Sequence, residues 1–200
     1  MIPKIKICGL SREEDIICVN GCRPEYIGFM FWEPSKRYIT PAKAAVLKEI
    51  LSPDIKAVGV FLDNPVSEVI EIAQSGVIDM IQLHGSEDAA YIKQIRKNTA
   101  LPIIKAFSVA KGADADTING SEADLVLIDS GRGGTGETFD WEFLQGIKRD
   151  YFLAGGLSPD NAVEAAKTGA YALDVSSGVE TEGKKDADKI RMFIDLARGN

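Results

Sequence analysis

The feature that most constrains the fold is a repeated alternation of short β-rich runs with amphipathic segments. Eight runs rich in β-branched and aromatic residues are expected to be strands: residues 4–8, 26–31, 55–62, 79–84, 102–107, 123–129, 151–155 and 171–176. Parallel neighbouring strands need a crossover connection, which is usually a helix. The alternation therefore predicts consecutive βαβ units.

Five of the intervening segments carry the signals of a helix: 11–20, 64–76, 86–98, 158–169 and 184–198. In the first, Ser11 precedes Glu14 by three residues, as in a capping box. In the second, Asn64 is a candidate cap, Pro65 is expected at the first helical position, and Gly76 marks the end. These start and stop signals place the predicted helices between the predicted strands.

Eight such units predict a (β/α)₈ barrel. With 200 residues, each unit averages about 25 residues, which is near the lower size limit of that fold. The interval 108–122 is the weakest and predicts a short or irregular fifth helix. A doubly wound open sheet is the alternative, but it usually has fewer strands and a glycine-rich turn after the first. The glycine-rich turns come late here, and no linker divides the chain, so residues 1–200 are expected to form one domain.

The charge balance argues against two classes of partner. The 23 basic and 30 acidic residues give a net charge of −7, which disfavours binding to nucleic acid or to anionic lipid. Neither a secretory signal nor an apolar run long enough for a membrane span is present, so a cytoplasmic protein is expected. The odd number of cysteines, Cys8, Cys18 and Cys22, predicts free thiols rather than disulfides, and a single histidine leaves no complete zinc ligand set.

Polar residues stand at the carboxyl ends of the predicted strands, where a barrel places its active site. They are Cys8 in the first strand, Gln82 and His84 in the fourth, Asp129 in the sixth and Asp174 in the eighth. Because side chains alternate in a strand, Gln82 and His84 share one face. These residues are candidates for the site.

Three late turns are rich in glycine: DSGRGGTGETF, AGGLSPDN and SSGVETEGKKD. Glycine lets backbone N–H groups approach an anion closely, and barrels often hold a phosphate in the loops after strands seven and eight. One such turn alone would be an ordinary connecting loop. Three in succession at the expected strand ends indicate a phosphate site.

The first strand, KIKIC, places Lys4, Lys6 and Cys8 on one face and Ile5 and Ile7 on the other. In a barrel, the isoleucines are expected to pack outward on the helices, with Lys6 and Cys8 facing the interior. Lys6 would then lie one layer below Cys8 and favour its thiolate. Lys4 is expected to be solvated at the bottom of the barrel.

A thiol at Cys8 and a carboxylate at Asp129 would suit proton transfer at two atoms of one substrate. No GxSxG elbow accompanies the single histidine, which argues against a serine hydrolase. Cys8 could equally be a small buried residue, and Asp129 could cap the following turn. Arg37, in a loop shaped by Pro34 and Pro41, is either a solvated side chain or a clamp for a carboxylate.

Several segments, in order over nearly the whole chain, resemble the phosphoribosylanthranilate isomerase family of tryptophan biosynthesis. They are KICGL, GFMF followed by PSKRYITP, VGVFLDN, QLHGSED, DSGRGGTGETFDW, LAGGLSPDN and DVSSGVETEGKKDADKI. The resemblance implies a (β/α)₈ barrel that converts N-(5-phosphoribosyl)anthranilate to its 1-deoxyribulose 5-phosphate product by an Amadori rearrangement, without cofactor or metal. The chain departs from the family loop SPR at Lys36, which puts the geometry of Arg37 in doubt.

The resemblance also implies roles for single residues. Cys8 would be the general base and Asp129 the general acid, Arg37 would hold the anthranilate carboxylate, and Asp174 would contact the sugar hydroxyls. Gln82 and His84 would line the site in roles that the sequence does not separate. The implied phosphate-binding residues are Gly134, Gly136, Gly155, Gly156, Ser177 and Gly178.

Two other functions remain open from the sequence. The sibling isomerase of histidine biosynthesis performs the same rearrangement on a substrate with two phosphates, but that family has an aspartate in the place of Cys8. A barrel that only senses a sugar phosphate would need the glycine loops and Arg37, and would be indifferent to Cys8 and Asp129. The sequence does not decide between a monomer and a homodimer.

Overall fold

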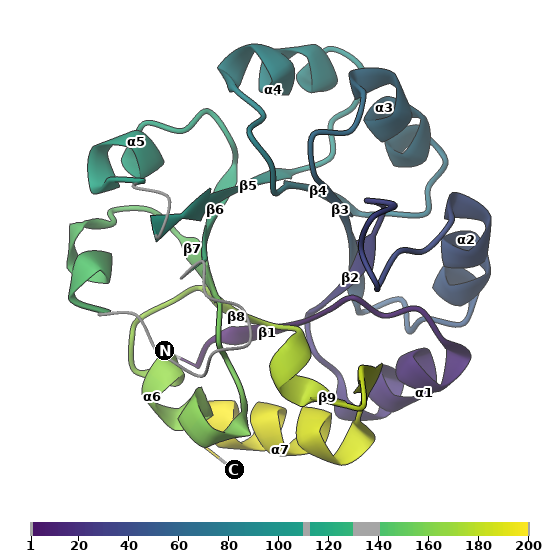
Figure 1. Cartoon of the computed structure of the whole chain (residues 1–200), viewed down its shortest axis with the longest axis vertical. Helices are drawn as coiled ribbons and strands as arrows, with labels where there is room; N and C mark the ends of the chain where they lie inside the picture. Colours follow the sequence, from purple (N-terminus) through teal and green to yellow (C-terminus); the bar gives the residue numbers. More distant parts are fainter. Residues whose placement is uncertain (1, 110–112, 130–140, 200) are drawn as a thin grey trace.

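Eight parallel strands form a closed barrel with helices around it (Figure 1). The computed structural model describes residues 2–109, 113–129 and 141–199. The strands are β1 (Lys4–Cys8), β2 (Tyr26–Met30), β3 (Lys56–Phe61), β4 (Met80–Leu83), β5 (Ile103–Ser108), β6 (Leu125–Asp129), β7 (Tyr151–Ala154) and β8 (Ala172–Val175). The sheet closes where β1 pairs with β8, with Lys6 opposite Asp174. The predicted (β/α)₈ fold is confirmed.

The helices differ greatly in length. They are α1 (Glu13–Cys22), α2 (Pro41–Glu49), α3 (Val66–Gln74), α4 (Ala89–Arg96), α5 (Ala115–Asn119), α6 (Ala162–Ala166) and α7 (Ala187–Arg198). The predicted short fifth helix is confirmed by the five residues of α5. The sequence did not predict α2, which buries only Ala44 and Leu47 and so has a weak apolar pattern. Within the described ranges, no helix is long and apolar enough to cross a bilayer.

Short 3₁₀ helices and a small hairpin complete the described elements. The 3₁₀ helices are η2 (Trp141–Gly146), η3 (Pro159–Asn161) and η4 (Ser177–Val179), and the hairpin pairs β9 (Glu180–Thr181) with β10 (Lys184–Lys185). Both η4 and the hairpin lie between β8 and α7. They therefore follow directly on the carboxyl end of the last barrel strand.

Two predicted helix starts are each wrong by one residue. Helix α1 has Arg12, not Ser11, at its N-cap, because the buried Asp15 carboxylate accepts from the backbone N–H groups of both residues and pairs with the Arg12 side chain. Helix α3 has Pro65 at the N-cap rather than at the first helical position. Asn64 does not cap this helix, since its Oδ1 accepts from the backbone N–H of Leu62 in the preceding turn.

Strand β1 separates two apolar regions as its alternation predicts. Ile5 and Ile7 are fully buried in the layer between the strands and the helices. Lys6 and Cys8 have the opposite orientation and face the barrel interior, where a second apolar cluster includes Val58. Apolar side chains thus fill the lower part of the barrel interior, while the part at the carboxyl ends of the strands is polar and holds the site.

Lys4 is not simply solvated at the bottom of the barrel, so that prediction is wrong. Its Nζ donates to the Tyr171 hydroxyl over 2.6 Å and lies 4.4 Å from the centre of that ring. The Tyr171 hydroxyl is also 3.0 Å from the Tyr26 hydroxyl. Because both rings lie against Phe152, Lys4 closes the bottom of the barrel through cation–π contact and hydrogen bonding.

Candidate active site

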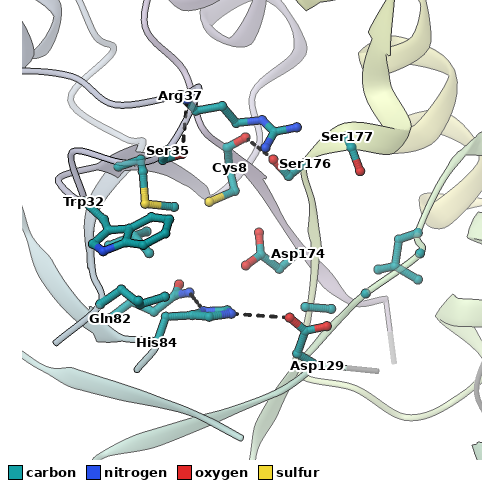
Figure 2. Close-up of a pocket in the computed structure, with 17 residues that line it drawn as sticks. Cys8, Trp32, Ser35, Arg37, Gln82, His84, Asp129, Asp174, Ser176 and Ser177 are labelled. Carbon is teal, nitrogen blue, oxygen red and sulfur yellow. Dashed lines mark hydrogen bonds and ion pairs between the residues drawn. The ribbon is translucent and has the colours of Figure 1, made fainter. Parts of the chain in front are cut away.

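A pocket of about 290 Å³ opens at the carboxyl ends of the barrel strands. Its lining includes the last residues of β1 and β6, Cys8 and Asp129, which face each other across it (Figure 2). Seven more predicted site residues line it: Arg37, Gln82, His84, Gly155, Gly156, Asp174 and Ser177. Lys6 lies buried beneath Cys8, and Gly178 follows Ser177 in η4. Gly134 and Gly136 lie outside the described residues.

Cys8 sits above a buried ion pair. Lys6 is 0% exposed, and its Nζ lies 2.7 Å from Asp174 Oδ2. Burial lowers the pKa of Lys6, but Asp174 and Cys8 raise it by more, so Lys6 is a cation at neutral pH. Burial raises the pKa of the Cys8 thiol above its usual value, and Lys6 opposes that rise. The direction agrees with the predicted effect of Lys6, although burial leaves the thiol harder to ionise than usual.

The predicted carboxylate clamp, Arg37, is already bonded to a carboxylate of the chain. Its Nε and Nη2 donate to Glu180 Oε1 and Oε2 over 2.6 and 2.8 Å. Lys185 Nζ lies 2.7 Å from Glu180 Oε1 and also donates to the carbonyl of Ser176. Burial raises the pKa of Glu180, but Arg37 and Lys185 lower it more strongly, to about 2. Glu180 is therefore an anion that orients Arg37 at the rim of the pocket.

Lys185, which was not predicted from the sequence, is a second cation close to the thiol. It lowers the pKa of Cys8, although less than Lys6 does. The Ser176 hydroxyl, next to it, donates to the Cys8 carbonyl over 3.0 Å. The motif GKKD carries this residue, but nothing in the sequence shows which of its two lysines turns inward.

Two glycines make room for these side chains. A Cβ on Gly28 of β2 would lie 2.6 Å from Cys8 Sγ, well inside van der Waals contact. A Cβ on Gly9 would clash with Arg37 Cδ, and Gly9 has φ +83, in the left-handed region that favours glycine. Both glycines are therefore part of the site, although neither carries a side chain.

Gln82, His84 and Asp129 form a line of hydrogen bonds along one wall (Figure 2). Gln82 Nε2 is 2.8 Å from His84 Nδ1, and His84 Nε2 is 3.3 Å from Asp129 Oδ2. The prediction that Gln82 and His84 share a face is confirmed, because both side chains line the pocket. The structure thus joins two strands, β4 and β6, through side chains.

The loops after β7 and β8 meet at one side of the pocket. Gly155 and Gly156 have φ of +90 and +66, a conformation in which successive N–H groups can converge on an anion. A Cβ on Gly178 would overlap the carbonyl oxygen of Leu157, so glycine is required for the two loops to touch. Ser177 lines the pocket beside them.

Apolar residues that were not predicted from the sequence complete the lining. Trp32 and Met30 come from the end of β2, while Val60 and Leu62 come from the end of β3. Trp32 directly follows a predicted strand, so extending the search for site residues one position past each strand would have found it. The pocket therefore has an aromatic wall between Arg37 and Gln82 (Figure 2).

Two buried oxygens beside the pocket have no hydrogen-bond partner among the described residues. They are Gln82 Oε1 and Asp174 Oδ1. Buried acceptors are normally satisfied, so both are suited to a ligand that carries hydroxyl or N–H donors. Over the same described ranges, no group of three His, Cys, Asp or Glu side chains is arranged to hold a metal ion.

A closed barrel with its polar pocket at the carboxyl ends of the strands is the arrangement of a (β/α)₈-barrel enzyme. Residues 5–196 match the family model of N-(5'-phosphoribosyl)anthranilate (PRA) isomerase. The isomerase of Endomicrobium trichonymphae is 40% identical over 98% of this chain and 99% of its own length. The chain therefore belongs to the phosphoribosylanthranilate isomerase family, whose enzymes act in tryptophan biosynthesis.

Solved structures agree with this assignment. A phosphoribosylanthranilate isomerase in complex with reduced 1-(o-carboxyphenylamino)-1-deoxyribulose 5-phosphate is 33% identical, with a TM-score of 0.84 over 99% of this chain and 100% of that one. Monomers generated from the dimeric isomerase of Thermotoga maritima are 32% identical, with a TM-score of 0.82 over the same shares.

Proposed function

We propose that this chain performs the Amadori rearrangement of N-(5-phosphoribosyl)anthranilate with Asp129 as general acid and Cys8 as general base. The observation that carries the proposal is the placement of these two groups on facing walls of one pocket, from β6 and β1, with Asp174 between them (Figure 2). Two proton-transfer groups on opposite sides of a substrate can act on two different atoms.

These two side chains are sufficient for the enzyme's proton transfers in the reaction. Asp129 gives a proton to the furanose ring oxygen, and the C–O bond breaks as the anthranilate nitrogen forms a Schiff base at C1′. The Cys8 thiolate then takes the proton from C2′, and the electron pair of that bond forms an enolamine. The enolamine tautomerises to the ketone, and return of one proton from the thiol to Asp129 through solvent restores the enzyme. No cofactor or metal enters this scheme.

The substrate's charged and polar groups fit the rest of the pocket. Arg37 would donate to the anthranilate carboxylate, with Trp32 beside the aromatic ring. Asp174 Oδ1, which has no partner among the described residues, would accept from a ribose hydroxyl. The phosphate would lie on the backbone of the glycine loops that contain Gly156 and Gly178. Gly155 and Ser177 belong to the same loops, and Gly134 and Gly136 are proposed with them.

The test is the loss of anthranilate-type fluorescence from freshly made substrate. We expect Cys8→Ser and Asp129→Asn each to reduce kcat by at least about a hundredfold, the low end for losing a general acid or base. Cys22→Ser and Asp195→Asn make the same chemical changes away from the pocket and should leave kcat unchanged. Near-normal turnover by either pocket variant would refute its assigned role.

We also propose a cytoplasmic enzyme, present as a monomer or a homodimer. All three cysteines are free thiols, and the Cys18 and Cys22 sulfurs lie 4.0 Å apart in a hydrogen bond rather than a disulfide, as suits a reducing compartment. Sedimentation of the purified chain over a range of concentrations distinguishes the two assembly states.

A further inference from the structure

The line of hydrogen bonds from Gln82 to Asp129 contains a single ring whose two nitrogens face different partners. His84 Nδ1 lies 2.8 Å from the Gln82 side-chain nitrogen, and His84 Nε2 lies 3.3 Å from Asp129 Oδ2. The His84 backbone is fixed as well, since its N–H donates to the Phe61 carbonyl over 2.8 Å. Gln82 is 1% exposed in the middle of β4, so its side chain has little freedom to reorient.

The two partners demand the same tautomer of His84. A carboxylate can only accept, so His84 Nε2 must carry the hydrogen when Asp129 is ionised. An amide NH₂ group can only donate, so His84 Nδ1 must present its lone pair to Gln82. A neutral ring protonated at Nε2 satisfies both contacts. If the amide were reversed, both ring nitrogens would need a hydrogen, and the ring would have to be an imidazolium.

We propose, on the basis of the proposed function, that Gln82 is a positioning residue that holds neutral His84 in the Nε2–H tautomer. This tautomer directs the catalytic proton of Asp129 to Oδ1. His84 donates to Oδ2, which keeps that oxygen an acceptor. The proton of the neutral acid therefore resides on the other carboxyl oxygen. In the chemical step, Gln82 acts through His84.

The other tautomer would work against an acid at this position. With hydrogen on Nδ1, His84 Nε2 would present a lone pair to Asp129 and compete with the substrate for its proton. The hydrogen bond would then hold the proton on Oδ2, between the two side chains. The identity of residue 82 thus affects the chemical step.

The sequence makes the tautomer directly measurable, because His84 is the only histidine in the chain. A long-range ¹H–¹⁵N spectrum of the uniformly labelled protein near neutral pH contains one imidazole, free of overlap. We expect the Nε2–H pattern in the unmodified enzyme. An Nδ1–H pattern or an imidazolium in an enzyme that turns over phosphoribosylanthranilate would overturn the role of Gln82.

Two substitutions change the donor while keeping the length of the side chain. Gln82→Glu replaces the donor by a carboxylate that can only accept, so we expect His84 to gain a hydrogen on Nδ1 and kcat to fall by about a hundredfold. Gln82→Met removes the donor, so we expect a mixture of tautomers and a fall of about tenfold, below the full loss of a general acid. KM should stay within about twofold in Gln82→Glu, which keeps an acceptor oxygen at this position.

Gln74→Glu is the matched control, since Gln74 lies exposed on α3 and donates only to the Asn98 carbonyl among the described residues. It should change neither the spectrum nor kcat. If the Gln82→Glu variant does not fold, the Gln82→Met variant and the spectrum of the unmodified protein still test the role of Gln82. A Gln82→Met variant with the original tautomer and kcat would overturn the proposal. Failure of the unmodified protein to act on the substrate would instead refute the proposed function.

Discussion

Arg37 and Glu180 are joined by two parallel hydrogen bonds of 2.6 and 2.8 Å, which tie the loop after β2 to the hairpin after β8. The planar guanidinium is thereby held in one plane at the rim of the pocket. Glu180 occupies Nε and one hydrogen of Nη2, so the remaining donors can serve a second carboxylate. The pair therefore orients a binding group before the substrate arrives.

Glu180→Gln should weaken substrate binding more than chemistry. The neutral amide loses the charge-assisted pair, so Arg37 must be ordered by the substrate itself. We expect KM to rise by about tenfold with kcat within about threefold, as for the loss of uniform binding. Steady-state fluorescence kinetics measure both. Glu182→Gln, on the exposed turn of the same hairpin, should leave KM unchanged, and an unchanged KM in Glu180→Gln would refute the orienting role.

Acid should remove the stabilisation that Glu180 supplies. Its pKa is lowered from 4.5 to about 2 in the folded protein, so the ionised form stabilises the fold above the unfolded pKa and loses that contribution as pH falls toward 2. The difference in free energy of unfolding between the unmodified chain and Glu180→Gln should thus be largest above about pH 5. Urea unfolding at a series of pH values measures it. A difference independent of pH would contradict the lowered pKa.

Lys6→Met should make the Cys8 thiol harder to ionise. Burial already raises the pKa of Cys8 and Lys6 opposes that rise, so removing the cation should raise the pKa further. Thiolate absorbance reports this in a chain with Cys18→Ala and Cys22→Ala, where Cys8 is the only thiol left.

The control for this prediction removes the partner of Lys6 as well. Asp174 raises the pKa of Cys8, so Lys6→Met with Asp174→Asn should give a thiol pKa below that of Lys6→Met alone. The double variant also avoids a buried carboxylate without its cation. Equal thiol pKa values in the unmodified and Lys6→Met proteins would leave Lys6 a structural role only.

Much of the fold could be predicted because its determinants are local. Alternation in β1 separates Ile5 and Ile7 from Lys6 and Cys8, and a period of two places Gln82 and His84 on one face. Strand ends converge in a barrel, so polar residues at those ends had to share a pocket. The placement of Asp129 and Asp174 in the same pocket as Cys8 follows from that geometry.

Contacts between distant loops could not be predicted in the same way. Arg37 and Glu180 are 143 positions apart, and nothing in either segment specifies the other. The inward turn of Lys185 depends on the hairpin geometry of β9 and β10. The start of α1 was missed for a different, local reason: Asp15, rather than Glu14, accepts from the backbone N–H of Ser11.

Gly28→Ala should damage catalysis through one added methyl group. Gly28 pairs with Cys8 across β1 and β2, and the new Cβ would lie 2.6 Å from Sγ, so the thiol must move. We expect kcat to fall at least about tenfold and the free energy of unfolding to fall by about 1–3 kcal/mol, as for overpacking.

Gly21→Ala is the matched control: its Cβ would meet nothing within 4 Å in α1, and alanine should add about 0.5–1 kcal/mol of stability without changing kcat. Urea unfolding and fluorescence kinetics on both variants measure these effects, and a Gly28→Ala enzyme with unchanged kcat would show that catalysis does not depend on the position of Cys8 Sγ.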